Sequence, residues 1–93
     1  MKLLFEWDAA KARANLKKHG ISFEEASTIF GDPCAITISS SSVSAEERFV
    51  TIGRTATGAY IIVVIHTDRN DRIRIISARP ASRAERRQYI DIG

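Results

Sequence analysis

The hydrophobic and polar positions in the second half of the chain predict a series of strands. Residues 48–54 and 72–79 carry β-branched side chains interleaved with arginines, as expected of strands buried on one face. Residues 60–65 are apolar at every position, which is typical of a central strand buried on both faces. Shorter strands are predicted at residues 2–7 and 35–39. Short polar links between the later segments favour antiparallel hairpins.

Helix start and stop signals occupy the first third of the chain and its C-terminal end. Asp8 is a suitable N-cap for a helix over residues 9–18, and Gly20 is a suitable residue to end it. The S-x-x-E spacing of a capping box, in which two side chains satisfy backbone N–H groups reciprocally, occurs at Ser22 and again at Ser82. A second helix is therefore predicted after the first, and a third after the last strand.

These elements predict one α+β domain spanning residues 1–93, because a chain of 93 residues can bury one modest core. We expect a twisted antiparallel sheet with two helices before it and one after it, and we expect the helices to cover one face. A serine-rich loop is predicted over residues 40–45. Strand parity places Arg72 and Arg74 on one face and Arg79 on the other, unless the strand contains a bulge.

Basic residues are concentrated in two places, although the formal net charge is only +3. Seven of the 14 lysines and arginines lie between Arg69 and Arg87, and a second run from Lys11 to Lys18 contains no acid. Same-sign clusters suit a polyanion or an acidic protein partner, while a solvated charged surface is the simpler explanation of either cluster alone. The planar donor fork of arginine matches phosphate, so phosphate or nucleic acid is the first partner to consider.

The composition argues against several other classes of protein. Cys34 is the only cysteine, so no internal disulfide can form and a reducing compartment is expected. The first residues lack the apolar run of a secretory signal, and the longest apolar run is too short to span a bilayer, which predicts a cytoplasmic protein. His19 and His66 are far apart, and neither paired cysteines nor a phosphate-cradling glycine motif occurs. We therefore predict no metal and no cofactor.

The remaining pattern suits metal-free cleavage of RNA, in which the 2′-hydroxyl of the substrate is the nucleophile. This reaction needs a base, cations for the developing charge, and an acid for the leaving oxygen. Histidine is the side chain best suited to exchange a proton at physiological pH, so His19 is the candidate acid or base, unless its only role is a favourable interaction with the dipole at the end of its helix. Glu47 is a candidate base, whereas Glu46 is better explained as a solvated loop residue and His66 as a structural one. Tyr89 could stack on a base, donate a proton or anchor the last helix to the sheet.

Four segments in series carry a resemblance to a known family. They are F-E-W-D (residues 5–8), K-H-G-I-S-F-E-E-A (18–26), I-G-R (52–54), and R-I-I-S-A-R followed by E-R-R-x-Y (74–89). In order and spacing they closely resemble the BrnT toxins over nearly the whole chain. The resemblance implies a toxin of a bacterial type II toxin–antitoxin pair with a RelE-like fold, and a ribonuclease that arrests translation. It also implies neutralisation by a BrnA-type ribbon-helix-helix antitoxin, with the complex binding its own promoter DNA.

The resemblance also implies site residues. RelE-like ribonucleases carry arginines on adjacent strands and often a tyrosine near the C-terminus, and Arg54, Arg79 and Tyr89 correspond to these by position. Lys18 and His19 lie nearby as residues of the family motif. The predicted catalytic set is therefore Lys18, His19, Glu47, Arg54, Arg79 and Tyr89, and the predicted RNA-binding set is Arg48, Arg72, Arg74, Arg83, Arg86 and Arg87.

Two other functions use the same basic residues. The first is a non-catalytic module that binds nucleic acid or an acidic antitoxin, which differs from a ribonuclease only in lacking turnover. The second is a DNA-binding protein in its own right. The sequence disfavours the second, because no helix-turn-helix spacing is evident and the arginines lie on a strand and its corner rather than on one recognition helix.

Overall fold

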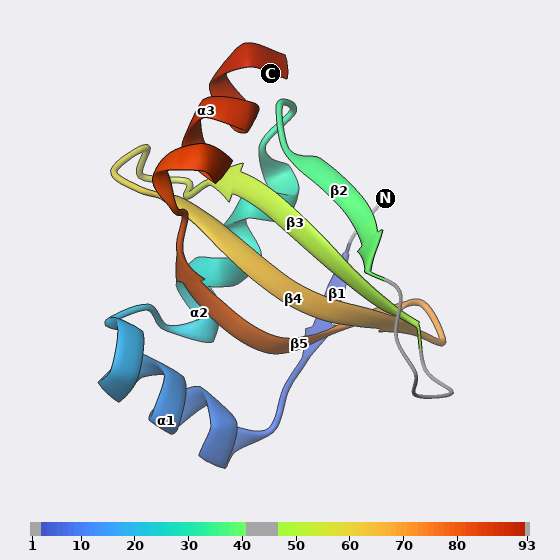
Figure 1. The fold of residues 1–93 in the computed structure, drawn as a ribbon. Helices are drawn as coiled ribbons and strands as arrows, with labels where there is room; N and C mark the ends of the chain where they lie inside the picture. The colour runs from blue at the N-terminus through green and yellow to red at the C-terminus, as the bar shows by residue number, and fades with distance from the viewer. Residues whose placement is uncertain (1–2, 41–46, 93) are drawn as a thin grey trace.

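The computed structural model describes residues 3–40 and 47–92, with only the backbone of residue 92 (Figure 1). Apart from Ser40, the predicted loop over residues 40–45 lies outside the described residues, as does Glu46. Within the described residues the fold is α+β, as predicted. Its elements are β1 (Leu4–Glu6), α1 (Ala9–His19), α2 (Phe23–Ser27), the 3₁₀ helix η1 (Thr28–Gly31), β2 (Ile36–Ser40), β3 (Arg48–Arg54), β4 (Ile61–Arg69), β5 (Arg72–Pro80) and α3 (Arg83–Ile92).

The described strands form one five-stranded sheet in the order β1-β5-β4-β3-β2. Strands β2 to β5 are joined in antiparallel fashion, as the short links predicted. Strand β1 pairs with β5 in parallel, so the sheet is mixed and the prediction of a wholly antiparallel sheet is wrong. The prediction rested on hairpin links, which fix the direction only of strands that follow each other in the chain. Most of the chain separates β1 from β5, so no hairpin sets their relative direction.

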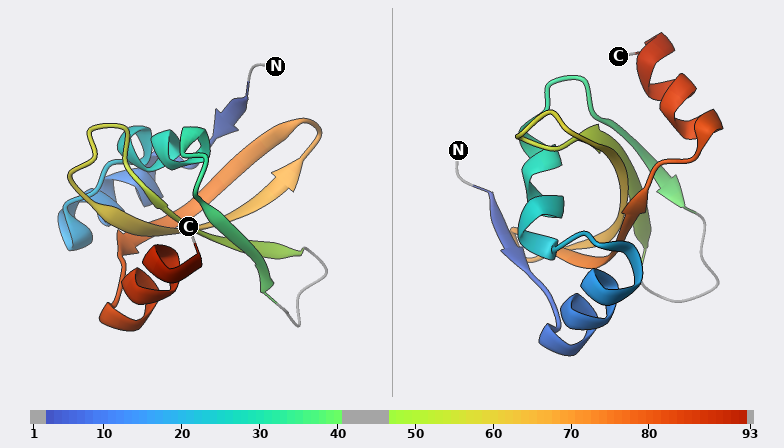
Figure 2. Two further views of the ribbon diagram at one scale, coloured as in Figure 1. Left: turned by 90° about the horizontal axis from the view of Figure 1, so that it is seen from above. Right: turned by 90° about the vertical axis from the view of Figure 1, so that its left-hand side faces the viewer.

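The helices lie on both faces of the sheet, which corrects the prediction that they cover one face (Figure 2). Helices α1 and α2 pack against β5 on one face, where Phe23, Ala26 and Ile29 join Ile62 and Val64 in the larger core cluster. Helix α3 lies on the opposite face, over a smaller cluster. The apolar run in β4 explains this arrangement, since a strand that is apolar on both sides needs cover on both sides.

Aromatic rings pack at the side of the larger core, and the backbone of β3 lies close to η1 at one point. The rings of Trp7 and Phe23 meet edge to face with their centroids 5.9 Å apart. A Cβ atom at Gly53 would lie only 2.9 Å from the Cβ of Ile29, so β3 can approach η1 only because this residue is glycine. Burial of Phe23 and Ile29 is complete. This core fixes α2 and η1, and with them the turn at Asp32, against the sheet.

His66 lies in this core, in keeping with the structural role that we expected for it. Its Nε2 atom is 2.8 Å from the hydroxyl of Thr51, and its ring stacks on Phe49 and meets Phe30 edge to face. Burial lowers the pKa of the imidazole, opposed by the nearby carboxylate of Asp68. His66 is therefore a neutral core residue at physiological pH.

Asn15 takes the place of a strand along part of β5. Because β1 pairs only with residues 72–74, the rest of that edge of β5 has no strand partner in the described sheet. The buried amide of Asn15 donates to the carbonyl of Ala78 (2.8 Å) and accepts from its N–H (3.1 Å). The same amide also donates to the carbonyl of Ile21 (3.1 Å). One side chain thus ties α1, the α1–α2 link and β5 together.

Tyr60 departs from the predicted strand. It was expected to open the buried central strand, but β4 begins at Ile61 and the Tyr60 side chain is 58% exposed. The four residues from Ile61 to Val64 are buried as predicted. No helix in the described part of the chain combines the length and apolarity that a membrane crossing requires.

Candidate functional site

A β-bulge places Arg79 on the same face of the sheet as Arg74. In the register of β4 and β5, Arg74 is opposite Thr67 and Arg79 is opposite Val63, and both of these partners point to one side of β4. The register shifts between these pairs, where Ile76 is the additional residue on β5. Strand parity predicted that Arg79 lies on the opposite face unless the strand contains a bulge. The structure contains that bulge, so Arg79 and Arg74 share a face.

The face of the sheet that α3 partly covers is therefore rich in arginine, and we call it the arginine face. Arg54 pairs with Ile61, which packs under α3, so β3 contributes Arg54 and, by its alternation, Arg48 to this face. At the end near α3, Arg54 and Arg79 lie on the two strands that flank β4. At the far end lie Arg48, Arg72 and Arg74.

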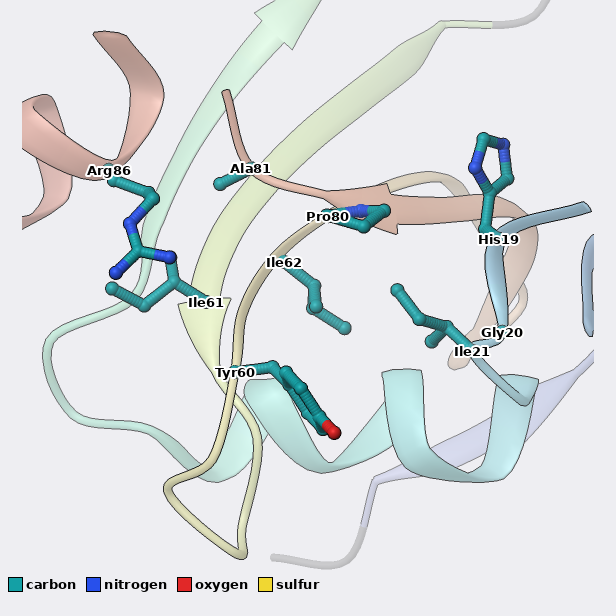
Figure 3. A pocket seen from close by; sticks show the side chains of 9 residues that line it. All are labelled: His19, Gly20, Ile21, Tyr60, Ile61, Ile62, Pro80, Ala81 and Arg86. Atoms are coloured by element: carbon teal, nitrogen blue, oxygen red, sulfur yellow. The ribbon is translucent and has the colours of Figure 1, made fainter. Parts of the chain in front are cut away.

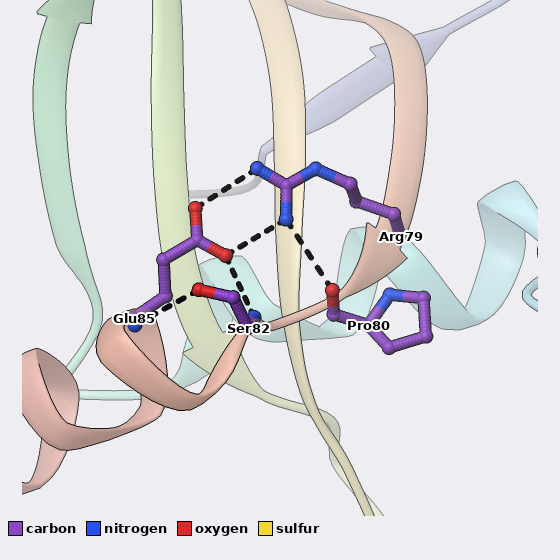
Figure 4. Close-up of polar contacts among 4 residues, drawn as sticks. All are labelled: Arg79, Pro80, Ser82 and Glu85. Carbon is purple, nitrogen blue, oxygen red and sulfur yellow. Dashed lines mark hydrogen bonds and ion pairs between the residues drawn. The ribbon is translucent and has the colours of Figure 1, made fainter.

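Arg79 is held by the first turn of α3 (Figure 4). Its Nη1 and Nη2 atoms donate to the two carboxylate oxygens of Glu85 at 2.7 and 2.9 Å. Glu85 also accepts from the N–H of Ser82 at 2.8 Å, and its own N–H donates to the Ser82 hydroxyl at 3.2 Å, which confirms the predicted capping box. The hydrogen bonds from Arg79 lower the pKa of Glu85 to about 2, and the same pairing raises the pKa of Arg79. Both groups are therefore charged at any physiological pH.

Arg54 lies against Tyr89, which is anchored to Asp32. The guanidinium carbon of Arg54 is 5.8 Å from the centroid of the Tyr89 ring, within the range of a cation–π contact. The hydroxyl of Tyr89 donates to Asp32 Oδ2 at 2.7 Å, and the backbone N–H of Arg54 donates to the same oxygen at 2.9 Å. The Tyr89 side chain is only 6% exposed. Of the three roles considered for Tyr89, the contacts match an anchor of α3.

The charges in this cluster follow from its hydrogen bonds. Burial alone would raise the pKa of Asp32, but hydrogen bonds from the N–H of Arg54, the hydroxyl of Tyr89 and the N–H of Cys34 outweigh it and lower the pKa. The bond to Asp32 raises the pKa of Tyr89, so the phenol stays protonated. Asp32 is a residue that sequence reasoning missed. Its only signal was its place in a Gly-Asp-Pro turn, which indicated the end of a helix rather than a partly buried hydrogen-bond acceptor.

Helix α3 therefore holds both candidate arginines from one side. Glu85 and Tyr89 are four residues apart and share a face of the helix, and that face is turned to the sheet. Glu85 binds Arg79 on β5, while Tyr89 lies on Arg54 from β3. These two polar contacts therefore fasten α3 to the sheet at two neighbouring turns of the helix.

His19 and Arg86 line the same pocket, which has a volume of about 200 Å³ (Figure 3). In this view they stand on opposite sides, with Ile62 and Ile21 between them. Pro80 also lines the pocket, so it lies beside the corner that carries Arg79. Lys18 does not line it. Together with His19, Lys18 lines a second pocket of about 310 Å³ between α1 and β5.

The other predicted site residues lie apart from this corner. Glu47 precedes β3 at the end opposite Arg54, roughly 20 Å away along an extended strand, and accepts a hydrogen bond from Ser39 at 2.7 Å. Arg74 forms an ion pair with Glu6 at 3.1 Å. Arg83 and Arg87 are exposed on α3. Within residues 3–40 and 47–92, no three histidine, cysteine or carboxylate side chains are grouped as ligands of a metal ion would be.

The fold and this arrangement of cations define a small α+β protein with a face suited to a polyanionic ligand. The sequence profile of the ribonuclease toxin BrnT, of type II toxin–antitoxin systems, matches residues 7–85. The chain therefore belongs to the BrnT family, and membership implies an RNA substrate and an antitoxin partner. A comparison with curated proteins gives no significant match.

Proposed function

We propose that this protein is a metal-independent endoribonuclease whose active site lies at the corner where β5 meets α3. The observation that carries the proposal is the pocket that His19 and Arg86 line from opposite sides, together with Pro80, the residue next to Arg79 in the chain (Figure 3). An imidazole that can exchange a proton and two guanidinium groups that can bind phosphate oxygens are what cleavage by the substrate's own 2′-hydroxyl needs.

The reaction has a simple balance. A base removes the proton of the 2′-hydroxyl, the 2′-oxygen bonds to phosphorus, and the bond from phosphorus to the 5′-oxygen breaks. The leaving 5′-oxygen takes a proton from an acid, so the products are a 2′,3′-cyclic phosphate and a 5′-hydroxyl. We assign one of the two proton transfers to His19. Arg79 and Arg86 stabilise the charge that develops on the phosphate oxygens.

Arg79 can bind a phosphate without releasing Glu85. The pair with Glu85 and a hydrogen bond from Nη1 to the carbonyl of Pro80 use three of its five N–H groups. The Nε–H and one Nη2–H remain, and the side chain is 40% exposed. Glu85 then acts as a positioning residue that fixes the orientation of the Arg79 guanidinium group.

We assign the remaining predicted catalytic residues to supporting roles. Tyr89 and Arg54 hold α3 in place over the sheet, and Lys18 adds positive charge near His19. Glu47 is too far along β3 to act at this corner, so we place it among the residues at the far end of the arginine face. The predicted RNA-binding residues there, Arg48 and Arg72, would bind more distant phosphates.

The cellular setting of the proposal follows from the family. We propose a RelE-like, cytoplasmic toxin that inhibits translation and is neutralised by a BrnA-type ribbon-helix-helix antitoxin, with promoter DNA bound only by the complex. The arginine face is the surface that the antitoxin would cover with acidic or aromatic residues. Undiminished RNA binding by the purified complex would show that the antitoxin acts elsewhere.

The deciding experiment is incubation of the purified protein with RNA in EDTA, followed by analysis of the cleavage ends. We expect cleavage by the wild type and by Arg13→Ala, which removes an exposed arginine on α1 away from the corner. We expect at least a hundredfold slower cleavage by His19→Ala and by Arg79→Ala, in line with the loss of a general acid–base or of a charge-stabilising donor. Thermal unfolding of each variant checks that the fold is intact.

Other outcomes separate the alternatives. Wild-type rates in both variants would remove His19 and Arg79 from the mechanism. RNA that stays intact with the wild type would leave a ribosome-dependent nuclease or a non-catalytic binding module. A translation extract distinguishes these two, because only the nuclease cuts messenger RNA there.

A further inference from the structure

Tyr60 is an exposed aromatic residue on an ordered turn. Its side chain is 58% exposed, while its carbonyl accepts a hydrogen bond from the N–H of Thr55 at 3.0 Å. The N–H of Gly58 donates to the carbonyl of Thr55 at 2.8 Å and tightens the same turn between β3 and β4. These hydrogen bonds fix the backbone position of Tyr60. Because most of the residue is exposed, packing in the core does not explain an aromatic side chain at this position.

The ring borders the pocket that also contains His19 and Arg86 (Figure 3). Ile21, Ile61 and Ile62 give this pocket an apolar floor. It therefore combines a flat aromatic wall, an apolar floor, a cation at one side and an imidazole at the other. At about 200 Å³ it is small for a drug-sized ligand, whose pockets start at about 300 Å³. A single planar group is the matching size.

We propose that this pocket is a binding subsite for one nucleobase of an RNA strand, in which Tyr60 stacks on the base and Arg86 binds the neighbouring phosphate. The inference rests on the proposed function and extends it to a residue outside the predicted site. Single-stranded RNA is bound by stacking of unpaired bases on aromatic rings together with cationic contacts to the backbone. Stacking tolerates every base, so the subsite contributes affinity and position rather than base identity.

The subsite also accounts for how the scissile phosphate would reach the catalytic groups. A base held between Tyr60 and the apolar floor would place its ribose and phosphate near His19 and Arg86, which line the same pocket. The neighbouring residue on β5, Arg79, supplies the next cation. Binding of one base thereby orients the reacting phosphate, which is the role of a positioning contact in a reaction with little covalent chemistry from the protein.

The test uses a short 2′-O-methyl RNA oligonucleotide that carries one 2-aminopurine. Methylation removes the 2′-hydroxyl, so affinity is measured without cleavage, by fluorescence anisotropy. Quenching of 2-aminopurine reports stacking on an aromatic ring. The proteins are the wild type, Tyr60→Ala, Tyr60→Phe and, as a control, Leu16→Ala, which shortens another exposed apolar side chain (50% exposed) outside the pocket.

We expect Tyr60→Ala to bind the oligonucleotide about tenfold more weakly or worse, as for the loss of one base–aromatic stack, and to lose the quenching. Tyr60→Phe keeps the ring and should match the wild type, as should Leu16→Ala. Wild-type affinity and quenching in Tyr60→Ala would overturn the proposal. So would a Tyr60→Ala protein that binds the oligonucleotide normally but forms a weaker complex with the antitoxin, since the ring would then serve a protein partner.

Cleavage of the unmodified RNA in EDTA, run in parallel, separates the two proposals. If the wild type cleaves and Tyr60→Ala binds like the wild type, the subsite is wrong and the proposed function stands. If the wild type binds through Tyr60 but leaves messenger RNA intact both in EDTA and in the translation extract, the proposed ribonuclease mechanism is wrong and the subsite stands.

Discussion

The buried amide of Asn15 joins three separate segments of this small protein through hydrogen bonds. Its side chain satisfies both backbone groups of Ala78 and the carbonyl of Ile21, at an edge of β5 where no strand of the described sheet pairs. A buried backbone group without a partner costs about 1–3 kcal/mol. The sequence offered no signal for this role, because an asparagine inside a helix looks like a mildly unfavourable surface residue until the sheet edge beside it is known.

Replacing Asn15 by aspartate should therefore destabilise the protein strongly. Aspartate keeps the shape and the acceptor for the N–H of Ala78, but it replaces the donor to two carbonyls with a buried charge. We expect a loss of about 2–4 kcal/mol in the free energy of unfolding, measured by urea denaturation. Ala14→Asp, at an exposed neighbouring position of α1, is the control and should lose well under half of that. Equal losses would mean that helix propensity, not the sheet edge, sets the effect.

Substitutions of Tyr89 can distinguish a structural anchor of α3 from a proton donor in catalysis. If its role is to hold α3 and Arg54, Tyr89→Phe should keep cleavage within about threefold of the wild type while losing about 1–2 kcal/mol of stability, since Asp32 loses one hydrogen bond. Tyr89→Leu removes the ring beneath Arg54 as well and should reduce both cleavage and stability further. A Tyr89→Phe protein of normal stability that no longer cleaves RNA would assign the phenol to proton transfer instead.

At the scale of elements, α3 depends on the ion pair and capping box at its first turn. The folded pKa of Glu85 is about 2, well below its ordinary 4.5, so the unfolded chain takes up a proton first as the pH falls. The stability that this group contributes is therefore complete above pH 4.5 and is lost as the pH falls toward 2. Arg79 is 40% exposed, so screening by water limits the contribution to about 1 kcal/mol.

Glu85→Gln should remove this acid sensitivity. We expect the wild type to exceed the variant by about 1 kcal/mol in the free energy of unfolding at pH 7, and the difference to vanish near pH 2. Urea denaturation at pH 7, 4.5 and 2.5 measures it. Glu24→Gln changes an exposed glutamate in the first turn of α2 and provides the control. A difference that is constant across this range would show that shape rather than charge is responsible.

The elements themselves were well predicted from local signals, whereas their arrangement was not. Capping side chains at Asp8, Ser22 and Ser82 gave the helix starts, because such caps act within four residues. The direction of β1 and the face taken by α3 depend on contacts between distant segments, which no local pattern records. The bulge at Ile76 belongs to the same group, since it is a property of the pairing of two strands.

The candidate site was predicted in its residue types more than in its geometry. The arginines at the β5–α3 corner and His19 were identified from charge clustering and from the resemblance to BrnT toxins. The anchoring by Asp32 and the exposed ring of Tyr60 were missed. Asp32 is defined by a hydrogen bond to a residue 57 positions away, and Tyr60 looked like the first residue of a buried strand.

At the scale of the whole molecule, the arginine face is long enough to bind several nucleotides. Strand β4 has nine residues and spans about 30 Å, from the α3 corner to the end where Arg72 and Arg74 lie. These two arginines are neighbours on one strand and face but differ in their charge balance. Arg74 is paired with Glu6 at 3.1 Å, whereas in the described part of the chain Arg72 has no carboxylate partner.

This difference predicts different effects on the salt dependence of RNA binding. Each phosphate that an arginine neutralises adds about 0.7 to the slope of log affinity against log salt for a single strand. Arg72→Gln should reduce the slope by about that amount, whereas Arg74→Gln should change it little and lower the stability, because Glu6 is left unpaired. Anisotropy titrations with the 2′-O-methyl oligonucleotide at several salt concentrations measure the slopes. Equal slopes for the wild type and both variants would confine RNA to the α3 corner, since a strand that ended there would not reach either arginine.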